Sequence, residues 1–255
     1  MTGLEGLEGL EIVLPAMFAG LMVAMLHVQL GIEVLRRGII FIDLAIAQIA
    51  GLCVVLVNLW AHDPSWILIQ TAAVMSALAA AIFFRWVERT APQEQEAVIG
   101  SSFILAAAAV LLALANHPHG GEEVQHILSG QILFVSWDRI LAFAPIYGVG
   151  LVLWFVFPVM RGGTGFFVLF AIVVTASVQL VGVYVVFASL ILPALAVNRL
   201  GKSSVGIAFF LSAVAVLGGI TLSAFADLPA GPTLVLAFAA VTIITRVTTL
   251  NRSPH

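Results

Sequence analysis

Charged residues are scarce in this chain, and their scarcity excludes an ordinary soluble protein. Of the 255 residues, 9% are charged and 62% are hydrophobic, and the mean hydropathy is +1.17. Soluble domains carry about 25% charged residues and are roughly half apolar. The composition therefore predicts an integral membrane protein.

The chain has a single cysteine, Cys53. One cysteine cannot form an intrachain disulfide or build a cysteine-based metal cage. We expect Cys53 to pack as a small apolar residue, and the redox compartment cannot be read from it.

Several functional motifs are also missing. The sequence contains no nucleotide-binding P-loop, so any ATP-driven role requires another subunit. It contains no His-Glu-x-x-His pair, and Ser101 and Ser102 lack an evident base, which argues against an intramembrane hydrolase. The net charge of −3, spread over short loops, provides no basic patch for a nucleic acid. Residues 1–11 contain no Lys or Arg, so we expect no signal peptide there.

What the sequence does contain is a series of apolar runs, each about 20 residues long, the length that crosses a bilayer. They lie near residues 12–34, 40–60, 65–84, 97–115, 138–157, 164–180, 181–198, 205–226 and 231–248. The join near Gln179 is unclear, so the runs predict nine spans with eight as the alternative. We expect an all-α polytopic membrane protein, with residues 1–255 forming a single transmembrane domain.

The basic residues predict its orientation, because cytoplasmic loops are enriched in Lys and Arg. With nine spans and an exterior N-terminus, only Arg139 of the ten basic residues falls outside. Losing one span would put the basic residues beyond it on the wrong side, which favours nine. Residues 1–11 then form an exterior tail, and the C-terminus is cytoplasmic.

Asp43 lies six positions after Arg37 in an otherwise apolar stretch. A lone acid in a membrane span is by default a candidate functional residue. The alternative is a carboxylate that pairs with Arg36 or Arg37 at the cytoplasmic edge.

Four stretches together resemble the membrane-spanning permease subunit of bacterial ABC importers for zinc, manganese and ferrous iron. They are similar, in order, to that family's first cytoplasmic turn and metal-pathway helix, the acidic start of its fourth helix, its Pro-broken helix and the turn before its last helix. The stretches are residues 36–51, 94–100, 189–200 and 227–233.

The resemblance implies a transport subunit of the bacterial cytoplasmic (inner) membrane, surrounded by lipid and without an ATPase site of its own. A homodimer would form the pathway, cytoplasmic ATPase subunits would drive it, and an exterior metal-binding protein would deliver the metal. The divalent metal is the transported substrate, and no prosthetic group is expected. The alternative is an ATP-independent metal or ion carrier, or a regulatory membrane protein, on the same scaffold.

The pathway residues depart from the family's pattern. Family members usually carry a His one helical turn after the pathway Asp, where this chain has Ala47. Gln48 is the nearest polar side chain, but it is rotated about 140° from Asp43 on a regular helix. His27 could supply an imidazole, or it could simply be hydrogen-bonded inside the bundle. Asp43 alone is a weak transition-metal site, although oxygen ligands suit hard ions such as manganese.

The exterior segment at about 116–137 contains a second set of potential metal ligands. Histidine and carboxylate together suit zinc, manganese or iron, so this segment could collect metal or face a delivery protein. The alternative is an ordinary polar loop. The residues are His117, His119, Glu122, Glu123 and His126.

Three further stretches bear on mechanism. Pro193 removes a backbone donor, so we expect either a broken helix that lines a pathway or a kink that only shapes packing. Residues 227–232 predict a tight exterior turn with Asp227 as a candidate cap. The 158–164 connection is too short for the docking helix that the resemblance implies. Either the 85–96 or the 199–204 loop contacts an ATPase instead, or the protein has diverged from ATP-driven import.

Overall fold

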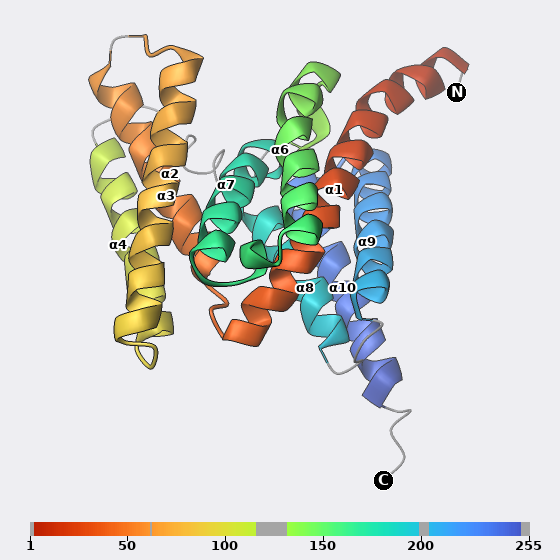
Figure 1. Ribbon diagram of the computed structural model, residues 1–255. Helices are drawn as coiled ribbons and strands as arrows, with labels where there is room; N and C mark the ends of the chain where they lie inside the picture. The colour runs from red at the N-terminus through yellow and green to blue at the C-terminus, as the bar shows by residue number, and fades with distance from the viewer. Residues whose placement is uncertain (1–2, 62, 116–131, 199–203, 251–255) are drawn as a thin grey trace. The chain divides into compact units, whose positions relative to one another are not determined.

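The computed structural model describes residues 3–61, 63–115, 132–198 and 204–250. Every regular element in these ranges is a helix, which confirms the all-α prediction (Figure 1). The elements are α1 (Gly3–Arg37), α2 (Ile42–Trp60), α3 (Trp66–Thr90), α4 (Gln95–Leu114), η1 (Ile132–Phe134), α6 (Trp137–Val156), η2 (Pro158–Arg161), α7 (Gly163–Val181), α8 (Val183–Val197), α9 (Ser204–Ala226) and α10 (Ala230–Leu250).

Eight of the described helices are long and apolar enough to cross a membrane. In α1 the membrane-length part is Val13–Arg37, and the helix itself begins earlier, at Gly3. The remaining predicted span corresponds to α8, which is apolar but has only 15 residues. Gly182 separates α7 from α8 with a φ of 82°, a conformation that glycine adopts without strain. The structure thus confirms a polytopic membrane protein.

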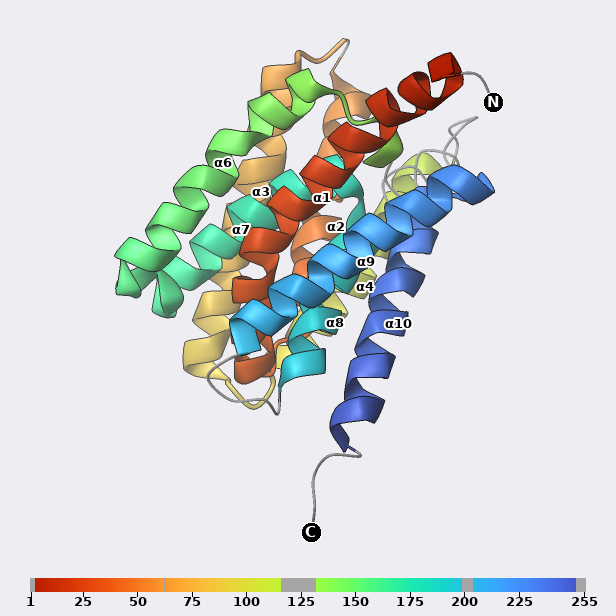
Figure 2. The same cartoon turned by 90° about the vertical axis from the view of Figure 1, so that its right-hand side faces the viewer.

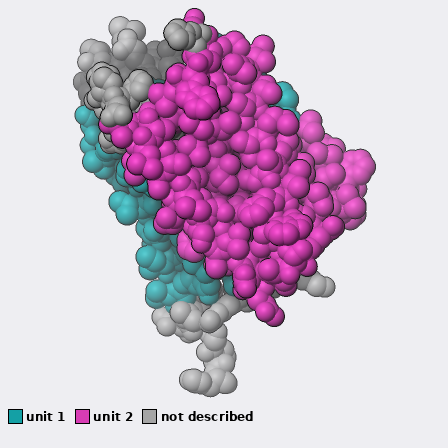
Figure 3. Space-filling view, turned by 90° about the vertical axis from the view of Figure 1, so that its left-hand side faces the viewer, with its two compact units in different colours: residues 1–37, 129–147, 180–255 teal, residues 38–128, 148–179 magenta. Residues whose placement is uncertain are grey.

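The chain divides into two compact units, each built from separate stretches of sequence (Figure 3). Unit 1 contains residues 1–37, 129–147 and 180–255. Unit 2 contains residues 38–128 and 148–179.

Glycines allow close helix packing in unit 1. There α1 packs against α8 and α9, and α10 packs against the same two helices (Figure 2). A Cβ on Gly31 would lie 2.0 Å from the Leu190 carbonyl oxygen, so α1 can approach α8 only with glycine at this position. A Cβ on Gly219 would lie 2.9 Å from a methyl group of Leu234. Small residues at crossings are the usual way in which membrane helices reach close contact.

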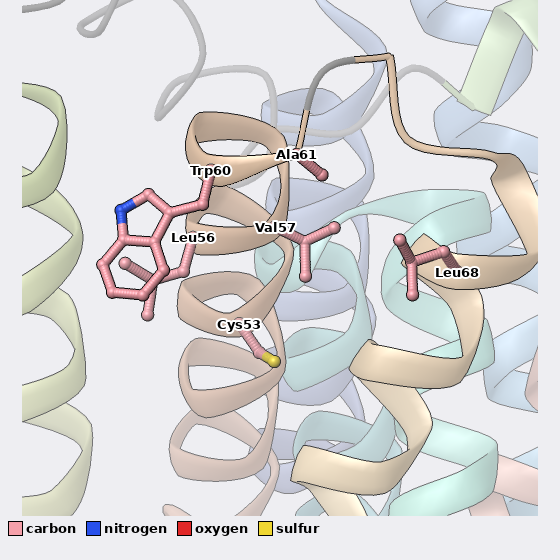
Figure 4. Close-up of a pocket in the computed structure, with 6 residues that line it drawn as sticks. All are labelled: Cys53, Leu56, Val57, Trp60, Ala61 and Leu68. Atoms are coloured by element: carbon pink, nitrogen blue, oxygen red, sulfur yellow. The ribbon is translucent and has the colours of Figure 1, made fainter.

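In unit 2, α2 packs against both α3 and α4 (Figure 1). Between α2 and the residues that follow it lies a groove of about 290 Å³ (Figure 4). Its lining is mostly aliphatic, with the Cys53 sulfur and the Trp60 indole as the exceptions, so Cys53 lies among apolar side chains as expected. The lining residues are Cys53, Leu56, Val57, Trp60, Ala61 and Leu68.

The expectation of a helix broken at Pro193 is wrong. Helix α8 continues through this residue to Val197, and the interruption lies earlier, at Gly182. Membrane helices tolerate proline where neighbouring groups satisfy the local carbonyls. At Pro193 the carbonyl that loses its helical donor is that of Ser189, four residues earlier. The Thr242 hydroxyl of α10 donates to a different carbonyl, that of Leu192, at 3.1 Å and so ties α10 to α8.

The expectation of a long loop over residues 85–96 is also wrong. Helix α3 runs to Thr90 and α4 begins at Gln95, so only residues 91–94 connect them. Arg85 and Glu88 form an ion pair within the last turns of α3. The segment is therefore the tip of a helical hairpin.

The turn predicted between the last two helices is confirmed. Asp227 has a φ of 50°, and the Leu228 N–H donates to the Ser223 carbonyl at 3.0 Å. This is the Schellman pattern, in which a left-handed residue ends a helix. Asp227 thus terminates α9 through its backbone.

Candidate functional site

Three of the described helices carry an acid as their second residue: Asp43 in α2, Glu96 in α4 and Asp138 in α6. A helix N-terminus has unpaired N–H groups and the positive end of the helix dipole, so it stabilises a carboxylate. Asp138 is exposed, whereas Asp43 is buried and Glu96 is partly buried. The acids of α2 and α4 are therefore the candidates for a role beyond helix stability.

Asp43 is 1% exposed, and neither carboxylate oxygen has a hydrogen-bond partner in the described part of the chain. Arg36 and Arg37 instead bind Glu33, at 2.6 and 2.7 Å. Both arginines thus have a carboxylate partner within α1. Burying a carboxylate in its ionised form without a partner is costly. Such an acid in a membrane helix indicates a functional site.

Glu96 reaches from α4 to the start of α2. Its Oε1 accepts a hydrogen bond from the Phe41 backbone N–H at 3.3 Å. Phe41 is the N-cap residue of α2 and makes no side-chain cap of its own, so a neighbouring helix satisfies this donor. The Glu96 Oε2 atom is buried and has no partner among the described residues. Asp43 and Glu96 also interact electrostatically.

Together these two side chains leave three buried oxygens unsatisfied: both of Asp43 and one of Glu96. They come from the first turns of two helices that pack side by side in unit 2. An arrangement of this kind concentrates negative charge where water is excluded. It can attract a cation, and it offers that cation only oxygen ligands.

The other predicted pathway residues lie elsewhere. Gln48 is buried, and because α2 is a continuous helix it lies about 140° around the axis from Asp43. His27 is 0% exposed in α1, and its Nδ1 lies 2.7 Å from the Ser189 hydroxyl of α8, inside unit 1. This hydrogen bond matches the alternative of a histidine bonded within the bundle. Metal binding by Gln48 and His27 stays a prediction.

The exterior ligand set lies outside the described residues, since His117, His119, Glu122, Glu123 and His126 all fall within 116–131. Within the described ranges, no group of three or more His, Cys, Asp or Glu side chains is placed to hold a metal ion. Metal contact by the exterior segment therefore stays a prediction.

The connection after α6 is as short as the sequence predicted. It consists mainly of η2, and Arg161 folds back so that its Nε donates to the Trp154 carbonyl at 2.8 Å. A second nitrogen of Arg161 donates to the Phe155 carbonyl at 3.2 Å. The arginine thus satisfies the last carbonyls of α6, as basic residues often do at helix C-termini.

Sequence reasoning gave Glu96 no role in the site. A signal was available, because Glu96 stands at the start of an apolar run just as Asp43 does. What the sequence did not reveal is that α4 packs beside α2 and brings Glu96 to the N-cap of that helix.

The fold and the buried acids define a class: a multi-pass α-helical membrane protein with charged side chains buried in its apolar helices. The sequence matches the ABC 3 transport family over residues 9–162 and 157–249, and the chain belongs to that family.

Among its relatives is the high-affinity zinc uptake system membrane protein ZnuB of Haemophilus influenzae. The two are 23% identical over 258 residues, which cover 92% of this chain and 96% of that protein. The fold is similar to that of PsaBC from Streptococcus pneumoniae in complex with Fab, with a TM-score of 0.73, 21% identity and coverage of 96% and 95% of the two chains.

A second solved structure, an inward-facing conformation of a putative metal-chelate type ABC transporter, has a TM-score of 0.70 and 13% identity, with coverage of 92% and 85%. These findings confirm the resemblance to permeases of metal ABC transporters. They also confirm a multi-pass protein of the cytoplasmic membrane.

Proposed function

We propose that this chain is the permease subunit of an ATP-driven importer for a divalent transition metal: zinc, manganese or iron. The observation that carries the proposal is the buried Asp43 carboxylate, which has no hydrogen-bond partner among the described residues of an ABC 3 family chain. The zinc uptake role in the name of the Haemophilus influenzae relative supports metal as the substrate class.

The residues suggest how the chain would act. An ionised Asp43 offers the cation a charged ligand that replaces part of its hydration shell. The first turn of α2 favours the ionised form of that ligand, because its N–H groups and dipole stabilise negative charge. The chain has no P-loop, so an ATPase subunit would supply the energy. A second copy of the chain would complete the pathway, and an exterior metal-binding protein would deliver the metal.

Replacing Asp43 tests the proposal directly. Asp43→Asn keeps the size of the side chain and removes its charge, so it should abolish uptake of radioactive zinc and manganese by cells while membrane abundance stays normal. Asp138→Asn is the matched control, because Asp138 has the same place in α6 but is exposed. Uptake at the level of the unmodified protein in the Asp43 variant would contradict a pathway role.

The short η2 connection favours a second candidate, an ATP-independent carrier on the same scaffold. The 3-10 helix η2 has only four residues, which leaves little chain for a docking helix between α6 and α7. Reconstitution of the purified chain alone in liposomes separates the two candidates. We expect no metal transport until an ATPase subunit is added. Transport without it would overturn the ATP-driven mechanism.

A further inference from the structure

We infer that Glu96 completes the cation site, so that Asp43 and Glu96 form one all-oxygen site for a hard divalent cation such as Mn²⁺. The inference deepens the proposed function and rests on it for the role of the site in transport. Binding itself can be measured without transport.

The geometry supplies the first argument. The Phe41 N–H places the Glu96 carboxylate at the N-cap of α2, two residues before Asp43. Only one of the two Glu96 oxygens is used in that contact, and the other is buried without a partner in the described part of the chain. Both Asp43 oxygens are likewise buried and make no hydrogen bond in the described chain, and the residue is 1% exposed. Three carboxylate oxygens around one helix start thus make no hydrogen bond in the described chain, although the backbone N–H groups of Asp43 and Leu44 act electrostatically on the Asp43 carboxylate.

Charge supplies the second argument. If both are ionised, the two carboxylates at the starts of these packed helices carry a charge of −2 and repel each other where the surroundings screen little. Arg36 and Arg37, the basic residues closest in sequence, are bonded to Glu33. A divalent cation would cancel the charge of the pair and satisfy the unpaired oxygens at the same time. A monovalent cation would leave one charge uncompensated.

The donor chemistry supplies the third argument. One helical turn after Asp43 stands Ala47, which has no donor atom, and His27 is hydrogen-bonded to Ser189. Carboxylate oxygens suit Mn²⁺, whereas imidazole nitrogen suits Zn²⁺. A site with oxygen donors alone should therefore discriminate less strongly in favour of Zn²⁺ than a site with an imidazole.

The test is a titration of the full-length protein in lipid nanodiscs with Mn²⁺, in which the electron paramagnetic resonance signal reports free Mn²⁺. His117, His119 and His126 are replaced by Ala in every variant, so that the exterior segment contributes less to the measured Mn²⁺ binding. Glu96→Gln is the informative variant, because the amide oxygen can still accept from the Phe41 N–H while the charge is lost. We expect Mn²⁺ affinity to fall by at least about tenfold, because even the loss of a group that only orients a metal ligand has an effect of that size.

Two further variants sharpen the result. Asp138→Asn should bind Mn²⁺ as the parent does, because this acid is exposed and lies in another helix. Glu96→His replaces an oxygen ligand with a nitrogen ligand at a partly buried position, so the ratio of Zn²⁺ to Mn²⁺ affinity should rise. Thermal unfolding of each variant verifies that it folds.

Some outcomes would overturn the inference. These are a parent protein that binds no Mn²⁺, a Glu96→Gln variant that binds it as tightly as the parent, or a Glu96→His variant with an unchanged Zn²⁺ to Mn²⁺ ratio. Loss of binding in Glu96→Gln together with absence of metal transport by the complete complex would support the site and contradict the proposed function. Metal transport by the complete complex together with unaltered Mn²⁺ binding in Glu96→Gln would contradict the site and support the proposed function.

Discussion

Burial distinguishes the acids of this protein more than their position in the helices does. Asp43, Glu96 and Asp138 each stand second in a helix, where a carboxylate is locally favourable. Asp138 meets solvent, whereas both Asp43 oxygens are buried without donors in the described structure. The same chemical group therefore stabilises one helix and marks a candidate site in another.

His27 shows the opposite case, a buried polar group with a described partner. Ser189→Ala removes that partner from the imidazole, so we expect a loss of about 1–3 kcal/mol of stability. Ser212→Ala is the control, since the buried Ser212 hydroxyl bonds only the carbonyl of Ala208 in its own helix. Thermal unfolding of the purified protein compares them. Equal melting temperatures for the two variants would contradict a structural role for the His27 contact.

Asp227 allows a prediction about backbone conformation. Its φ of 50° is unfavourable for a side chain branched at Cβ and natural for glycine. Asp227→Val should lower stability by about 1–2 kcal/mol, while Asp227→Gly should not. The melting temperatures of the two variants are the measurement. If valine and glycine prove equivalent there, the left-handed turn is not what ends α9.

At the scale of elements, the helical hairpin α3–α4 replaces the loop expected from sequence. Arg89, near the end of α3, and Glu94, in the four-residue turn, are both exposed. The last turn of α3 and the short connection to α4 hold these two charges in a defined arrangement that a long free loop would not provide. With η2 so short, the hairpin tip is the better candidate surface for an ATPase subunit.

Charge reversal tests that surface. Arg89→Glu combined with Glu94→Lys should uncouple ATP hydrolysis from metal uptake, because exposed charges of the wrong sign disfavour docking. The protein itself should remain folded, since neither charge is buried. ATPase activity and metal uptake of the reconstituted complex are measured together. Normal coupling in the double variant would place docking elsewhere on the chain.

At the scale of the whole molecule, orientation follows from the basic residues and is open to a direct test. In a Cys53→Ser background, a cysteine at position 118 should react with an impermeant thiol reagent in intact cells. A cysteine at the exposed position 93 should react only after permeabilisation, because the positive-inside rule puts the α3–α4 turn in the cytoplasm. The reverse pattern would invert the topology, and exterior labelling of both would remove α4 as a span.

The sequence by itself determined the class of protein and most of its helices. Apolar runs of membrane length form helices in a bilayer because every backbone group must be satisfied within the segment, which is a local requirement. Residues 164–180 and 181–198 correspond closely to α7 and α8 for this reason. The same local logic failed at Pro193, because α8 continues through the proline to Val197 within a packed unit.

Only the tertiary structure decided which polar side chains have partners. His27 and Ser189 are 162 positions apart, and Phe41 and Glu96 are 55 positions apart, so no local pattern links them. Asp43 was identified from sequence as an acid in an apolar stretch. That its oxygens are buried without donors in the described chain, beside a carboxylate from α4, depends on helix packing. Burial and pairing are properties of contacts between distant segments, and these contacts exist only in the folded protein.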